Sequence, residues 1–210
     1  MISDNQRKRD RAAAIAWAQA IKNNPDKYLI LDIGGIEPSD PCDEVRSIAI
    51  TTLDGATIYA KSLRASTEKS DAPTLAQVWP DILRLTNNHT VLVYNEEFID
   101  NAISHTLEAQ GLRNRLTAEC VMLQYAAFVN KYNARHEDYT WQKLPGPSHD
   151  DPEEDCLRIL AVINTMAKVA PAVAVEAAPP APLNRRKAAL FWALLFVIYF
   201  LCARMQAPHP

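Results

Sequence analysis

Apolar residues recur at helical spacing near the start of the chain and at strand-like spacing soon after it. The first pattern covers residues about 7–24 and predicts an amphipathic helix. Three strand-like runs follow, at about 28–33, 44–51 and 57–63. The last two flank Asp54-Gly55, a dipeptide typical of a hairpin turn. The chain is therefore predicted to open with a helix and a three-stranded antiparallel meander.

Beyond residue 70, helical patterns dominate and one short apolar strand separates them. Helices are expected at about 74–85, 98–110, 120–132 and 152–169, with a strand at about 89–94. A meander followed by β-α units is typical of an α/β domain with one mixed sheet and helices packed against it. We therefore expect residues 1–169 to form one such domain.

The C-terminal part of the chain differs in composition from the rest. Residues 170–187 are rich in Ala, Pro and Val and end in a basic flank, which predicts an extended linker. The predicted helix 188–204 includes 16 consecutive uncharged residues, which span about 24 Å as a helix. This length is slightly shorter than a bilayer core of about 30 Å. Residues 205–210 form a short tail after the helix. This pattern predicts a transmembrane helix.

The uncharged run is apolar on every face, which argues against the alternatives of a core helix or an interfacial helix. Arg185, Arg186 and Lys187 precede the run, and Arg204 follows it. Because basic residues favour the cytoplasmic side, this bias places the folded domain in the cytoplasm. We therefore predict a single-pass membrane protein with a C-terminal anchor.

Composition and charge narrow the function only slightly. Of 210 residues, 48% are hydrophobic and 22% are charged, which is ordinary for a globular protein. The net charge of −3 gives no basic footprint for nucleic acid. A metal-dependent nuclease does not need such a footprint, because its ions supply positive charge. The four cysteines lack CxxC spacing, which argues against a zinc site and favours reduced thiols.

Three segments place acidic residues at the edges of predicted strands and helices. They contain Asp32 (segment 28–35), Asn95, Phe98 and Asp100 (segment 94–100), and His149 and Asp155 (segment 149–156). The order and spacing of these segments resemble the DEDDh (DnaQ-like) 3′–5′ exonucleases of the ribonuclease H-like superfamily. The similarity covers about residues 8–167 and includes the segments 44–50, 71–74, 119–126 and 139–144.

The resemblance implies a ribonuclease H-like fold with a site for Mg²⁺ or Mn²⁺. Exonucleases of this family hold two metal ions with converging carboxylates and use a histidine as general base. Asp32 and Asp155 match two metal-binding aspartates of the family. Asp100 lies one residue late for a third metal ligand, and His149 lies one residue early for the base. Asn95 and Phe98 match positions that contact the substrate, which is single-stranded nucleic acid or a 3′ end.

The sequence also departs from the pattern of the family. Gly34 stands at the position of a metal-bridging glutamate, and Ile99 stands at the position of an aspartate. Glu37 can replace the glutamate only on a different backbone path. The segment that grips the 3′ end in the family is missing, because the chain runs straight through residues 63–70. Restoring both ligands, by Gly34→Glu with Ile99→Asp, is expected to raise metal affinity if the backbone follows that of the family.

Three functions therefore stay open. The first is a membrane-anchored, nucleic-acid-binding module with impaired or lost catalysis. The second is an active Mg²⁺- or Mn²⁺-dependent 3′–5′ exonuclease that uses shifted ligands, and the third is a membrane-tethered scaffold without a nucleic-acid function. Each matched residue also has a plain structural interpretation: Asp32 as a turn acid, Asp155 as a solvated acid at a helix start, and Asn95 and Phe98 as turn and core residues.

Overall fold

The computed structural model describes residues 2–36, 43–146 and 150–170 of the chain. The strands are β1 (Tyr28–Gly34), β2 (Ser47–Thr51), β3 (Thr57–Ser62), β4 (Thr90–Val93), β5 (Ala118–Cys120), β6 (Tyr132–Asn133) and β7 (Asp138–Tyr139). The helices are α1 (Asp4–Asn23), α2 (Leu75–Thr86), α3 (Glu96–Ala109), α4 (Val121–Val129) and α5 (Pro152–Ala167), with a short 3₁₀ helix, η1 (Pro25–Lys27).

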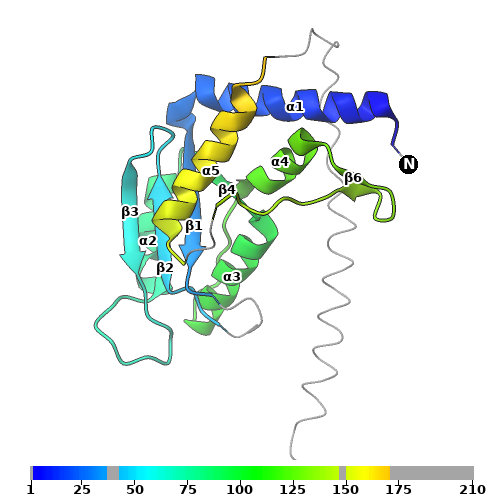
Figure 1. Cartoon of the computed structure of the whole chain (residues 1–210). Coiled ribbons are helices and arrows are strands. Elements are labelled where there is room, and N and C mark those ends of the chain that lie inside the picture. The colour runs from blue at the N-terminus through cyan, green and yellow to red at the C-terminus, as the bar shows by residue number, and fades with distance from the viewer. Residues whose placement is uncertain (1, 37–42, 147–149, 171–210) are drawn as a thin grey trace, which may run out of the picture. The chain divides into compact units, whose positions relative to one another are not determined.

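The main sheet has five strands in the order β3-β2-β1-β4-β5 (Figure 1). β1 pairs antiparallel with β2, and β2 pairs antiparallel with β3, as the predicted meander requires. β4 is parallel to β1, and β5 is parallel to β4. The predictions of an α/β domain and of a mixed sheet are thus confirmed. The strands β6 and β7 form a separate small hairpin.

Helices cover both faces of the sheet and create two hydrophobic cores. Apolar residues of α2 and α3 pack on one face, and those of α1, α4 and α5 pack on the other. The strand β1 contributes to both cores because its side chains alternate between the faces. Leu31 and Ile33 point into the α2–α3 core, and Ile30 points into the core on the opposite face, between the sheet and α1, α4 and α5. Asp32 shares the face of Ile30 and therefore lies on the α5 side of the sheet.

The helices that carry candidate residues begin at well-formed caps. Asn95 caps α3, because its side-chain oxygen accepts a hydrogen bond from the backbone N–H of Phe98 at 3.4 Å. Asp151 caps α5 in the same way through the N–H of Glu153 at 2.9 Å, and Pro152 occupies the first helical position. These caps fix where α3 and α5 start, and α5 packs on β1 and β2 (Figure 1).

Several sequence predictions fall outside the described residues. These are the substitute ligand Glu37, the general-base candidate His149, and the linker, transmembrane helix and tail over residues 171–210. Within the described ranges, no helix is long and apolar enough to span a bilayer. Membrane anchorage and the cytoplasmic location of the domain therefore stay predictions.

Candidate functional site

Asp32 is an almost fully buried carboxylic acid near the end of β1, with only 7% of its surface exposed. Burial raises the pKa of Asp32 well above its usual value, because a charged carboxylate is poorly solvated there. The negative charge of Asp155 on α5 raises this pKa further. A hydrogen bond from the backbone of Ile33 and the positive charge of Arg158 act in the opposite direction but do not cancel the effect. The structure thus brings Asp32 and Asp155 into one electrostatic site.

Asp155 lies in the first turn of α5 and forms an ion pair with Arg158, one turn further along the helix. Both side chains are largely buried, with exposed fractions of 20% for Asp155 and 14% for Arg158. Arg158 was not among the residues expected at the site, although its i,i+3 spacing from Asp155 is a typical signal of a helical ion pair. The site therefore contains two acidic groups and one fixed cation.

Gly34 is closely packed on the same face of β1 as Asp32. A Cβ atom at Gly34 would lie 2.5 Å from the carbonyl oxygen of Asp150 and 2.6 Å from the hydroxyl oxygen of Ser47. Both distances are shorter than any normal contact of a Cβ atom. The space that a glutamate would need is therefore filled by the chain that leads into α5. A glutamate at this position would therefore require Ser47 or the backbone at Asp150 to move.

The second motif has a different environment from Asp32. Ile99 is buried in the α2–α3 core, and Phe98 packs against the edge of that core. Asp100 is also buried, where its carboxylate accepts hydrogen bonds from the guanidinium of Arg115 and from the backbone N–H of Leu116. Leu116 belongs to the α2–α3 core, whereas Asp32 faces α5. Asp100 is thus engaged in a local ion pair, and Asn95 and Phe98 shape the start of α3.

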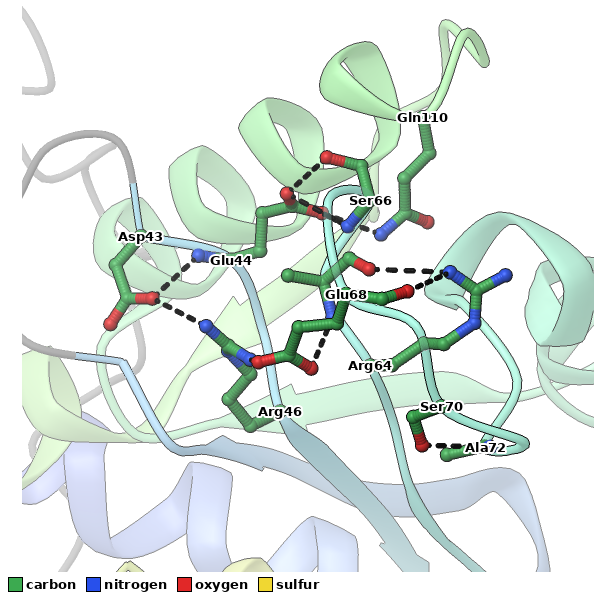
Figure 2. Close-up of polar contacts among 10 residues, drawn as sticks. Asp43, Glu44, Arg46, Arg64, Ser66, Glu68, Ser70, Ala72 and Gln110 are labelled. Atoms are coloured by element: carbon green, nitrogen blue, oxygen red, sulfur yellow. Dashed lines mark hydrogen bonds and ion pairs between the residues drawn. The ribbon is translucent and has the colours of Figure 1, made fainter.

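The loop after β3 lies where the family resemblance lacks the segment that grips a 3′ end. Figure 2 shows a polar cluster that anchors this loop on the buried carboxylate of Glu44. That carboxylate accepts hydrogen bonds from the backbone N–H of Ser66 at 3.0 Å, from the Ser66 hydroxyl, and from the side-chain amide of Gln110 at 2.7 Å. Arg46 joins the cluster through ion pairs with Asp43 and Glu68.

These hydrogen bonds determine the charge of Glu44. Burial acts to raise the pKa of Glu44, but the hydrogen bonds from Ser66 and Gln110 outweigh burial and hold the pKa below its usual value. Glu44 is therefore ionised at neutral pH, and the loop between β3 and α2 is tied to the end of α3 through Gln110. The cluster is a structural anchor.

A shallow groove of about 310 Å³ lies beside the Asp32–Asp155 site. Its walls are formed by β2, β3 and the start of α5, and they include Ser47, Lys61, Ser62 and Asp150. Ser47 and Asp150 are the residues in close contact with Gly34, which places the groove next to the site. Hydroxyl and ammonium groups are common donors to phosphate oxygens, whereas the acidic wall at α5 opposes an anion.

The described residues do not fit a two-metal nuclease site. Such chemistry needs several carboxylates that converge on two cations. In the pattern of the resemblance, the glutamate position holds Gly34, the second aspartate position holds the core residue Ile99, and Asp155 is already paired with Arg158. Over residues 2–36, 43–146 and 150–170, no cluster of three or more His, Cys, Asp or Glu side chains is arranged to hold a metal ion. Asp32 and Asp155 remain the pair with the chemistry for a single divalent ion.

Comparison with known proteins adds no identification. Neither a protein-family model nor a curated protein sequence matches this chain. The assignment of the chain therefore depends on its own residues and on the resemblance of its motifs.

Proposed function

We propose that this chain is a ribonuclease H-like, DEDDh-exonuclease-like domain that binds single-stranded nucleic acid and hydrolyses it inefficiently or not at all. The observation that carries the proposal is that α5, which bears Asp155, packs on β1, which bears Asp32, so that the charge of Asp155 acts on Asp32. These two positions are more than 100 residues apart in the sequence, and they match the first and last acidic motifs of the exonucleases.

The topology supports the same proposal. A three-stranded antiparallel meander continues into parallel strands, and helices lie on both faces of the sheet. A ribonuclease H-like domain has this arrangement, with its first acidic residue on the central strand. The groove beside Asp32 adds Lys61, Ser47 and Ser62 as donors for a phosphate backbone.

Inefficient hydrolysis follows from the side chains that replace the missing ligands. Gly34 has no side chain to offer, and its surroundings exclude one. Asp100 is held by Arg115, which keeps it from acting as a shifted ligand in this conformation. Because metal ions supply both the nucleophile and the charge stabilisation in this chemistry, losing their ligands costs orders of magnitude in rate.

Two measurements on the full-length chain test the proposal. Binding of a labelled single-stranded oligonucleotide should weaken as salt rises, because phosphate contacts release counterions. Single-turnover digestion with Mn²⁺ should be far slower than ordinary enzyme turnover of about 1–1000 s⁻¹. Digestion at ordinary rates that Asp32→Ala abolishes would show an active exonuclease. A lack of any salt-dependent binding would favour the membrane-tethered scaffold.

A further inference from the structure

Arg158 is held more firmly than a surface arginine. Besides the ion pair with Asp155, its Nε atom donates a hydrogen bond to the carbonyl oxygen of Pro145 at 2.8 Å. Its Nη2 atom donates to the carbonyl oxygen of Leu144 at 3.2 Å. The guanidinium therefore links the first turn of α5 to the segment 144–146, which crosses beside it.

Gly146 makes this close packing possible. Its φ angle of +108° lies in a region that favours glycine, and a Cβ atom there would lie 2.9 Å from Nε of Arg158. A larger residue at this position would push the segment away from the guanidinium. The guanidinium of Arg158 therefore has three fixed acceptors: the carboxylate of Asp155 and the carbonyl oxygens of Leu144 and Pro145.

We infer that Arg158 is a built-in cation that takes the place of a divalent metal ion at Asp155. Two acids whose charges interact inside a fold are stabilised by a positive partner, or one of them takes up a proton. In a metal-dependent site that partner is an ion from solution, whereas here it is covalently part of the neighbouring helix turn. The geometry supports this role because the guanidinium is largely buried and bonded to both the acid and two carbonyl groups.

A divalent ion at Asp155 would meet two obstacles. It would have to displace Arg158 from its carboxylate, and it would then be repelled by a guanidinium that the carbonyl groups still hold nearby. Even at an effective dielectric constant typical of protein surfaces, repulsion between charges a few ångströms apart is strong enough for a tenfold or larger change in affinity. Removing the positive charge of Arg158 should therefore uncover a divalent site at Asp155.

Titration of the full-length chain with Mn²⁺, in mild detergent and without nucleic acid, tests this inference. Arg158→Gln should bind Mn²⁺ at least about tenfold more tightly than the wild-type chain. Arg158→Lys keeps the charge and should stay close to wild type. The gain should disappear in the double variant Arg158→Gln with Asp155→Asn. Equal Mn²⁺ affinities of Arg158→Gln and wild type, or a gain that survives Asp155→Asn, would overturn the inference.

Arg84 provides a matched control. It pairs with Asp81 at the same i,i+3 spacing on α2, at 2.8 Å, but both side chains are exposed. Arg84→Gln should leave Mn²⁺ binding unchanged, which separates the local effect from a general change in charge. If Arg158→Gln does not fold, the melting temperature of the wild-type chain is measured with and without about 1 mM Mn²⁺. A rise in the wild type that is absent in Asp155→Asn would refute the inference. No rise in the wild type would support it.

The inference builds on the exonuclease-like site of the proposed function, but its test is independent of nucleic-acid binding. A chain that binds no oligonucleotide can still show the Arg158-dependent change in Mn²⁺ affinity. Conversely, salt-dependent oligonucleotide binding can hold even if Arg158→Gln gains no Mn²⁺ affinity. The two failures are therefore distinguishable.

Discussion

The anchor at Glu44 makes a sharp prediction for the variant Glu44→Gln. The change keeps the size of the side chain but replaces one acceptor oxygen by an NH₂ group. In the wild type, one carboxylate oxygen accepts from the amide nitrogen of Gln110 and the other accepts from the Ser66 hydroxyl. The glutamine variant keeps only one acceptor oxygen, which carries no charge, for these donors.

Gln110 cannot adapt by rotating its amide. Its side-chain oxygen accepts a hydrogen bond of 2.7 Å from the backbone N–H of Ala76 in the first turn of α2. Turning that amide would break the bond, so the amide of the variant must direct its own oxygen at Gln110 and its NH₂ group at Ser66. The Ser66 hydroxyl can then only accept, and the Ser66 backbone N–H loses one of its two acceptor oxygens. Hydrogen bonds to a charged group contribute about 1.5–3 kcal/mol each, against about 0.5–1.5 kcal/mol for neutral ones. We therefore expect a loss of about 2 kcal/mol and a melting temperature lower by roughly 4–8 °C.

The effect of Glu44→Gln should depend on pH with a defined sign. Because the folded-state pKa of Glu44 is lowered, its ionised form stabilises the fold above the usual pKa of about 4.5. This stabilisation is lost as the pH falls through the lower folded-state value. The difference in unfolding free energy between wild type and Glu44→Gln should thus be largest near neutral pH and shrink below about pH 4.5.

Urea denaturation followed by circular dichroism measures this difference at each pH. Glu68→Gln is the matched control, since it makes the same chemical change within the loop that Glu44 anchors, on a side chain that is 46% exposed. Its cost should stay below about 1 kcal/mol, as for other exposed ion pairs. If Glu44→Gln were no less stable than Glu68→Gln at neutral pH, the description of Glu44 as a buried anchor would be wrong.

Three further predictions follow from other parts of the fold. Gly34→Glu should lower the melting temperature and leave Mn²⁺ affinity unchanged, because its Cβ atom would collide with the carbonyl of Asp150. Asp100→Ala should destabilise the fold by about 1–3 kcal/mol, leaving Arg115 without its carboxylate partner, and should not change any residual nuclease rate. Cys156, whose pKa burial raises to about 12, should resist alkylation at pH 8 until the chain is unfolded, as mass spectrometry of the peptide that contains it can show.

Local patterns were sufficient for most elements of the fold. The meander around Asp54-Gly55 and the helices α1, α2, α3 and α5 are confirmed, with ends shifted by a few residues. The strand β5, Ala118–Cys120, was missed because it has only three residues and runs directly into α4. The hairpin of β6 and β7 was missed for the same reason, since two-residue strands carry no periodicity.

The site was harder to predict than the fold. Asp32 and Asp155 could be chosen from the sequence because the resemblance links their positions. The crowding at Gly34 could not, because it arises from contacts with Ser47 and with Asp150, far along the chain. Such packing depends on the path of the chain into α5, and the spacing of residues near Gly34 does not predict it. The anchor of Arg158 on Leu144 and Pro145 was missed for the same reason.

The charges of the residues around Asp32 and Asp155 are balanced without metal ions. A two-metal site balances several carboxylates against two divalent ions. At the two positions where the exonuclease resemblance implies a glutamate and an aspartate, this chain has Gly34 and Ile99, so less negative charge has to be neutralised there. A single guanidinium beside Asp155, together with a raised pKa that favours the neutral form of Asp32, is sufficient for the acids that are left. Gly34 and Ile99 therefore have two effects: they offer no metal ligand, and they add no negative charge near Asp32 and Asp155.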